Sequence, residues 1–165
     1  MASASRKIII AYDQSIVGLQ VLEWVNSHSI LLPGDDVTVV LAINEDFGKI
    51  DGPGGLQVQG GLGGLNSTLE YRETVRLLEK QGQERLDEAV YAIKQLGIKN
   101  VKSEILRGHA QVVITKYAKE QQADIVICGN RGYGYIKRKL IGSTSEYLTH
   151  HLDCTVMIVR VHRDK

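Results

Sequence analysis

Residues 124–145 read DIVICGNRGYGYIKRKLIGSTS and join a short apolar run to a basic loop that contains glycines. The run 124–128 is rich in β-branched residues, which predicts a strand buried on both faces of a parallel sheet. Gly129, Gly132 and Gly142 punctuate the loop, and hydroxyl residues follow at 143–145, where a helix is expected to begin. Glycines permit close backbone approach, and a helix N-terminus offers free N–H groups to an anion. The stretch therefore predicts a strand, a phosphate-sized anion site and a helix, in that order.

The rest of the chain alternates apolar strands with amphipathic helices. We expect strands at 7–12, 36–43, 101–106, 124–128 and 155–161, and helices after Ser15 and at about 68–96, 110–121 and 142–151. This alternation implies right-handed crossovers and a parallel sheet. The prediction is a single doubly wound α/β domain over residues 1–165, with a five-stranded parallel sheet and helices on both faces. The Gly-rich segment at about 44–67 is expected to be a mobile loop of this domain.

The helix at 68–96 presents one apolar face with steps of three and four residues, as a helix covering a sheet should. Gly82 lies on that face and predicts close approach to the sheet, and Gly97 is expected to end the helix. The residues of the face are Val75, Leu78, Gly82, Leu86, Ala89, Ile93 and Leu96.

Composition excludes several classes of protein. Hydrophobic residues make up 43% and charged residues 24% of the chain, and the formal net charge is +1, which gives no argument for nucleic acid or an anionic membrane as partner. No apolar run approaches the roughly eighteen residues of a membrane span, and the segment MASASRKIII lacks a signal-peptide pattern. Cys128 and Cys154 are too few for a disulfide framework. We expect a cytoplasmic protein.

Two common phosphate-binding motifs do not match this sequence. Gly129 and Gly134 have the separation of the Walker A glycines, but Tyr135 and Ile136 stand where lysine and a hydroxyl residue are required. The dinucleotide fingerprint fails because Lys137 occupies its third glycine position, and the first strand–helix turn, AYDQS, has no glycine.

The spacing that remains is Gly129-x2-Gly132-x9-Gly142-Ser143, which resembles the ATP-binding signature of the universal stress protein family. Four further blocks resemble the family in order and spacing: KIIIAYDQS (7–15), LLPGDDVTVVLAI (31–43), the segment 105–129 and STSEYLTHHLDCTVMIVR (143–160). The chain departs from the family at Gly108-His109-Ala110, where Gly-Asp-Pro is frequent, and at Asn130, where serine or threonine is common.

The resemblance implies a fold like that of the adenine nucleotide alpha hydrolases, with strand order 3-2-1-4-5, and ATP with Mg²⁺ as cofactor. It also implies a homodimer paired through the strand 155–161, which would close a sheet edge that is otherwise open. Carried over position by position, the nucleotide-binding residues are Asp13, Leu41, Ala42, Gly129, Arg131, Gly132, Gly142, Ser143, Thr144 and Ser145.

Several of the polar residues have a simpler explanation than ligand binding. The Asp13 carboxylate can accept hydrogen bonds from a ribose or adenine, or can complement the N-terminus of the following helix. Ser143 with Glu146 forms an S-x-x-E capping box that needs no ligand. The basic triplet 137–139 either forms an exposed, solvated face or attracts a phosphate group. His150, His151 and Cys154 could hold a metal ion, but histidines that complement a helix C-terminus explain them better.

The sequence favours a nucleotide-dependent regulatory or stress-response module with at most slow ATP hydrolysis, because no water-activating constellation is recognisable. One alternative is an adenylyl-transferring or ATP-hydrolysing enzyme of the related adenine-nucleotide-binding class. For adenylyl transfer, an H-I-G-H or S-G-G-x-D-S motif would be expected in the first turn, and AYDQSIVG has neither. The other alternative is an interaction module without nucleotide, in which the glycine spacing would be lost.

Overall fold

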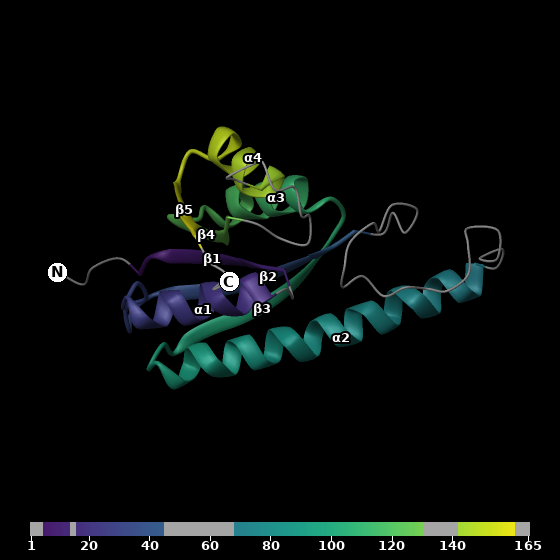
Figure 1. Cartoon of the computed structure of the whole chain (residues 1–165), viewed down its shortest axis with the longest axis horizontal. Helices are drawn as coiled ribbons and strands as arrows, with labels where there is room; N and C mark the ends of the chain where they lie inside the picture. Colours follow the sequence, from purple (N-terminus) through teal and green to yellow (C-terminus); the bar gives the residue numbers. More distant parts are fainter. Residues whose placement is uncertain (1–4, 14–15, 45–67, 131–141, 161–165) are drawn as a thin grey trace, which may run out of the picture.

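The computed structural model describes residues 5–13, 16–44, 68–130 and 142–160, whose elements form one sheet with helices on both faces (Figure 1). All five strands pair in parallel, in the order β3-β2-β1-β4-β5, which confirms the predicted α/β class and strand order. The elements are β1 (Lys7–Tyr12), α1 (Ile16–Ser27), β2 (Asp36–Ile43), α2 (Thr68–Gln95), β3 (Asn100–Arg107), α3 (Ala110–Gln121), β4 (Ile125–Gly129), α4 (Ser143–His151) and β5 (Thr155–Val159).

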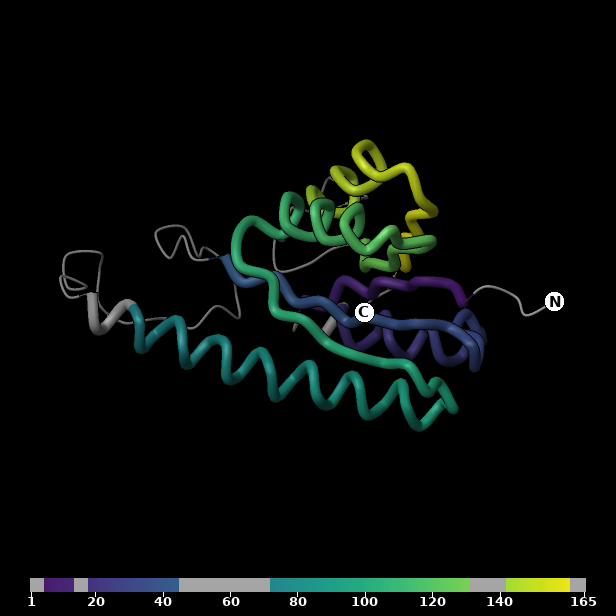
Figure 2. Tube along the Cα trace, turned by 180° about the vertical axis from the view of Figure 1, so that it is seen from behind, coloured from purple at the N-terminus to yellow at the C-terminus, as the bar shows by residue number. Residues whose placement is uncertain are grey.

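The central strand β1 separates two apolar cores. Ile8 and Ile10 face the core beneath α1 and α2, and Ile9 faces the core beneath α3 and α4. The two helix pairs lie on opposite sides of the sheet in both views (Figures 1 and 2). Burial of each isoleucine side chain is worth roughly 1.5–3 kcal/mol, so the alternation along β1 fixes which way the strand faces. None of the described helices has the length and apolarity needed to span a bilayer.

Helix α2 buries the middle of the predicted face, whereas Val75 and Leu78 nearer its start are half-buried. Leu86, Ala89 and Ile93 are buried, as predicted, but Leu96 is 37% exposed. The helix ends at Gln95, and Gly97 has φ of +84°, so the chain turns before Leu96 can reach the sheet. Ile98, which is 2% exposed, fills the core position beyond the turn. The prediction for Leu96 was therefore wrong, because helical spacing cannot show where a helix stops.

The edge strands differ from their predicted bounds. Strand β3 is one residue longer at each end than predicted, because it pairs with β2 along its whole length, from Asp36↔Asn100 to Ile43↔Arg107. Strand β5 was expected to run to residue 161 but ends at Val159, and position 161 lies outside the described residues. Asn130 N–H donates to the carbonyl of Val159 at 2.9 Å. Since backbone groups alternate in direction along a strand, those of Val156 and Ile158 point toward the open edge.

The amino-terminal edge of the sheet is held by an ion pair between the residues that precede β1 and β2. Arg6 Nε and Nη2 donate to Oδ1 and Oδ2 of Asp35 at 2.8 and 2.6 Å, and Leu32 N–H donates to Asp35 Oδ2 at 2.7 Å. The hydrogen bond with Asp35 raises the pKa of the Arg6 guanidinium. Asp35 is 2% exposed, so these three hydrogen bonds satisfy a carboxylate that has almost no contact with water.

We predict that Asp35→Ala lowers the free energy of unfolding by about 2 kcal/mol, between the values for exposed and buried ion pairs because Arg6 is partly exposed. The matched control is Asp36→Ala, which removes a neighbouring carboxylate that is less buried and should cost less than about 1 kcal/mol. Urea denaturation measures both variants. Equal losses in the two variants would contradict the role assigned to Asp35.

Candidate functional site

The strand register brings the carboxyl ends of β2, β1 and β4 together at one edge of the sheet. Tyr12 pairs with Leu41, so Asp13 leaves β1 at the level of Ala42. Ala11 pairs with Cys128, so Asp13 also lies level with Asn130, two residues farther along each chain. Neighbouring strands are about 4.8 Å apart. The predicted residues Asp13, Leu41, Ala42 and Gly129 are thus brought together on three adjacent strands. Arg131 and Gly132 lie outside the described residues.

The two described ends of the segment between β4 and α4 are joined by a hydrogen bond. Gly142 N–H donates to the carbonyl of Asn130 at 2.6 Å, and Asn130 N–H in turn continues the β4–β5 ladder through Val159. Whatever path residues 131–141 take, the N-terminus of α4 is therefore held beside the end of β4. A helix N-terminus in this place carries a partial positive charge toward the carboxyl edge.

Gly142 is the N-cap of α4, with φ −73° and ψ 155°, and its carbonyl accepts from Glu146 N–H at 2.9 Å. Ser143 is therefore the first helical residue, and the Ser143–Glu146 capping box suggested by the sequence is wrong by one position. Within the described part of the chain, no side-chain hydrogen bond caps the N-terminus of this helix. The backbone N–H groups of its first turn are thus the donors that an anion would meet there.

The three hydroxyl residues of α4 have different surroundings. Ser143 is exposed and Thr144 is half-buried, so both side chains lie within reach of solvent at the helix start. Ser145 is 3% exposed, and its Oγ donates to the carbonyl of Gly142 at 3.2 Å. Its hydroxyl proton therefore stabilises the first turn of the helix, and Ser143 and Thr144 are the hydroxyls better placed for a ligand.

Strand β2 extends past its neighbour β1 at the carboxyl edge. Its last pairing with β1 is at Leu41, whereas Ala42 and Ile43 pair onward with β3. The Leu41 side chain is buried in the core, so only its backbone faces the edge. The carbonyl of Ile43 accepts from Gly108 N–H at 2.9 Å. Ala42 therefore presents backbone beside Asp13, where a planar ligand edge can be hydrogen-bonded.

The side chain of Tyr12 is buried at the end of β1, next to Asp13. Tyr12 is buried in the core beneath α1 and α2, and this burial raises the pKa of its phenol, with a further raising contribution from Asp13 and a lowering one from Arg85. The phenol therefore stays neutral, and its ring forms an apolar surface at the end of β1. Asp13 itself is half-buried.

One contact at this edge was not foreseen from the sequence. Gly108 has φ of +127°, and His109 follows it as the N-cap of α3. His109 Nδ1 lies 3.4 Å from Nδ2 of Asn44, the residue after β2. The two residues are 65 positions apart, and no local pattern links them. The pair places an imidazole at the same edge as Asp13.

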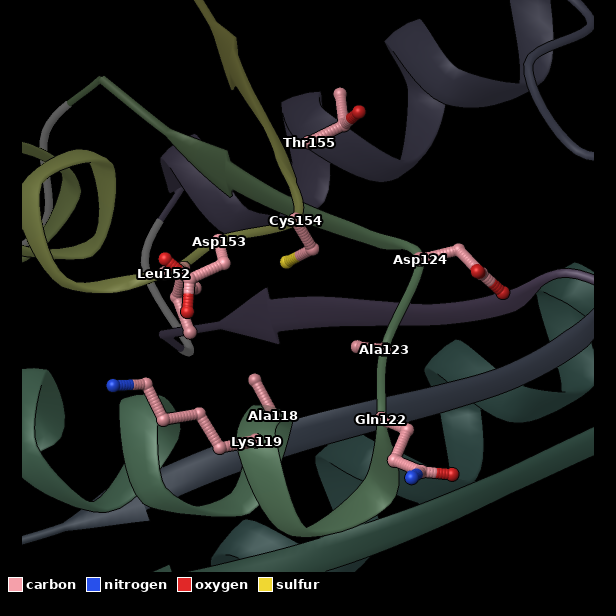
Figure 3. Close-up of a pocket in the computed structure, with 9 residues that line it drawn as sticks. All are labelled: Ala118, Lys119, Gln122, Ala123, Asp124, Leu152, Asp153, Cys154 and Thr155. Atoms are coloured by element: carbon pink, nitrogen blue, oxygen red, sulfur yellow. The ribbon is translucent and has the colours of Figure 1, made fainter.

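The opposite, amino-terminal edge carries a separate depression of ≈ 530 Å³ between the ends of α3 and α4 (Figure 3). Burial raises the pKa of the Cys154 thiol in this depression, and raises that of Cys128, in the core, to about 12. None of the predicted site residues that the structure describes lines the depression. Its lining residues are Ala118, Lys119, Gln122, Ala123, Asp124, Leu152, Asp153, Cys154 and Thr155.

One of the two histidines at the end of α4, His151, packs locally against the same helix. The His151 ring stacks on that of Tyr147 with centroids 3.7 Å apart, and His151 Nδ1 lies 2.8 Å from the Tyr147 carbonyl. Across the described residues, no three His, Cys, Asp or Glu side chains are grouped to hold a metal ion.

Fold and site together define a doubly wound α/β protein with a carboxylate and a helix N-terminus at the carboxyl edge of its central strands. The model of the universal stress protein family matches residues 63–160, more than half of the 165 residues. The chain belongs to the universal stress protein family.

Curated relatives agree with this assignment. A universal stress protein of Methanocaldococcus jannaschii is 30% identical over 97 residues, which are 59% of this chain and 56% of that protein. A universal stress protein of Synechocystis is 29% identical over 97 residues, which are 58% of this chain and 89% of that protein. Among the first relatives, the aligned segments span 39% and 56% of the relatives' own lengths.

Solved structures share the fold over almost the whole chain. A hypothetical protein whose biochemical function was assigned from its structure has 22% identity and a TM-score of 0.76, covering 98% of this chain and 100% of that one. A universal stress family protein of Arabidopsis thaliana with AMP bound has 17% identity and a TM-score of 0.61, with 95% and 92% covered. A universal stress protein of Archaeoglobus fulgidus in complex with dAMP has 18% identity and a TM-score of 0.54, with 94% and 98% covered.

Proposed function

We propose that this protein binds ATP at the carboxyl edge of its sheet and acts as a nucleotide-dependent regulatory or stress-response module with at most slow hydrolysis. The observation that carries the proposal is that the Asp13 carboxylate and the N-terminus of α4 lie at the ends of the neighbouring strands β1 and β4. Among the described residues, no side-chain hydrogen bond caps that N-terminus. The family structures with AMP and dAMP support an adenine nucleotide as the ligand class.

In this proposal each group meets the part of the nucleotide that suits its charge. Asp13, an acceptor, binds the hydroxyls of the ribose or the amino group of adenine. The backbone of Leu41 and Ala42 holds the base. The first-turn N–H groups of α4 and the hydroxyls of Ser143 and Thr144 hold the phosphates. From the sequence spacing, Gly129, Arg131, Gly132 and Gly142 complete the phosphate loop, and Ser145 supports its helical end.

The donor set fits a nucleotide better than it fits a resident metal ion. Mg²⁺ usually keeps several waters and is bound through substrate phosphates with one or two carboxylates. Asp13 is a carboxylate of the described chain at this edge, and it is assigned to the nucleoside. We therefore propose that Mg²⁺ arrives on the ATP phosphates, where it would neutralise their charge.

The groups at the described carboxyl edge support slow ATP hydrolysis at most. Asp13 follows β1, and His109 lies beside Asn44 after β2. General-base catalysis needs a base within hydrogen-bond reach of the attacking water, opposite the leaving group. A carboxylate assigned to the nucleoside is poorly placed for that task, so we favour a binding module that senses the nucleotide.

We predict that Asp13→Ala weakens adenosine, AMP and ATP binding by similar factors of about tenfold or more, since a hydrogen bond to a charged group is worth about 1.5–3 kcal/mol. Isothermal titration calorimetry gives the three affinities. Asp153→Ala, which removes an exposed carboxylate at the opposite edge, is the matched control and should bind like the wild type. Wild-type protein that binds no adenine nucleotide would overturn the proposal. A loss confined to ATP would move Asp13 to the phosphates or their metal ion.

We also propose that the protein is a homodimer joined through β5. Strand β5 is the last in the sheet order, and the outward backbone groups of Val156 and Ile158 are suited to pair with a second copy. A two-fold contact between identical strands would close the edge.

Ile158→Pro should dissociate this dimer, because proline removes the outward N–H of the edge strand without touching the N–H groups directed at β4. Ile158→Ala, which shortens the same side chain but keeps the N–H, is the control and should stay dimeric. Multi-angle light scattering at tens of micromolar distinguishes the two states. A monomeric wild type would refute the dimer, and an Ile158→Pro dimer of unchanged affinity would place the interface elsewhere.

A further inference from the structure

Gly18 of α1 lies against the end of β1, where a side chain would collide with two residues at once. It is buried, and a Cβ at this position would lie 2.9 Å from Oδ1 of Asp13 and 3.0 Å from Cδ2 and Cε2 of Tyr12. These distances are shorter than ordinary van der Waals contacts, which begin at about 3.5 Å. The hydrogen of the glycine is therefore what lets the carboxylate and the ring lie side by side against the helix.

The backbone at Gly18 does not itself require glycine. The described glycines with positive φ are Gly97 and Gly108, so Gly18 has an ordinary helical conformation. Alanine is the better helix former at such a position. The chain thus keeps glycine in a helix at a cost in helix propensity, and the space occupied by Asp13 and Tyr12 is the reason that the structure shows.

Of the two neighbours, Asp13 is the one that would move. Tyr12 is 4% exposed and belongs to the core cluster that includes Ile10 and Val21, so its ring is confined on all sides. Asp13 is half-buried at the carboxyl edge, and the atom that the Cβ would meet, Oδ1, is the far end of its side chain, which can shift more readily than a buried ring. A methyl group at position 18 would therefore displace the carboxylate more than the ring, which lies at 3.0 Å and would have to shift by only a few tenths of an ångström.

We propose that Gly18 is a positioning residue for nucleotide binding, which holds the Asp13 carboxylate in the orientation that the nucleoside requires. This inference rests on the proposed function, because it takes Asp13 as the group that contacts the nucleoside. Gly18 acts through Asp13, since the space that it leaves is filled by the Asp13 carboxylate and the Tyr12 ring.

A double-mutant cycle between Gly18→Ala and Asp13→Ala tests the coupling, with ATP as the ligand so that phosphate contacts keep binding measurable. Gly18→Ala should weaken ATP binding about tenfold in the wild-type background, and less than about twofold when Asp13 is already alanine. Gly34→Ala is the control, because no atom lies within 4 Å of its Cβ position. It should bind like the wild type. A Gly18→Ala protein of unchanged affinity, or the same loss in both backgrounds, would overturn the inference.

Unfolding of the same four proteins gives a second cycle that needs no nucleotide. If the methyl group collides with the carboxylate, Gly18→Ala should lower the melting temperature more in the wild type than in Asp13→Ala, where the collision is reduced. If Gly18→Ala alone fails to fold, recovery of folding in the double variant supports the contact, and failure of both overturns it. If the wild type binds no ATP, the proposed function fails, and this cycle alone decides whether Gly18 positions Asp13.

Discussion

The parallel pairing of β1 between β2 and β4 is the constraint on which the candidate site depends. Pairing in this register puts Asp13, Ala42 and Asn130 at one level, because Asp13 and Asn130 directly follow β1 and β4, and Ala42 follows Leu41, the β2 partner of Tyr12. A slip of β1 by two residues would keep its apolar faces but move the carboxylate by about 7 Å, since a strand rises about 3.3 Å per residue. Such a slip would break the bidentate contact of Arg6 with Asp35 at the amino-terminal edge, so this contact stabilises the observed register.

The two edges of the sheet differ in how their polar groups are arranged. At the amino-terminal edge two carboxylates are paired: Asp35 with Arg6, and Asp124 with the N–H of Lys7 at 2.7 Å. At the carboxyl edge the helix N-termini offer donors that a ligand can use, and the Gly142 cap leaves the first turn of α4 to its backbone. In doubly wound sheets ligands bind at the carboxyl ends of the strands, where the strand order reverses. Here that reversal falls between β1 and β4.

Much of the fold followed from periodicity and little of the site geometry did. Alternation and helical spacing predicted the strands and helices to within one or two residues, because burial imposes those patterns directly. Predictions from local spacing were wrong for the burial of Leu96 and for the capping box of Ser143, because both depend on the residue at which a helix begins or ends. The contact of Asn44 with His109 and the fit of Gly18 against Asp13 depend on tertiary packing, which sequence spacing does not encode.

The most direct test of the central claim is an amide NMR titration of the ¹⁵N-labelled protein with ATP and Mg²⁺. If the nucleotide binds at the carboxyl edge, the largest shift changes should fall on the amides of Asp13, Ala42 and Ser143. The amides of Cys154 and Thr155, across the sheet at the amino-terminal edge, should stay unchanged. Saturable shifts confined to Cys154 and Thr155, with Asp13 and Ser143 unmoved, would contradict the account and place the nucleotide in the depression between α3 and α4.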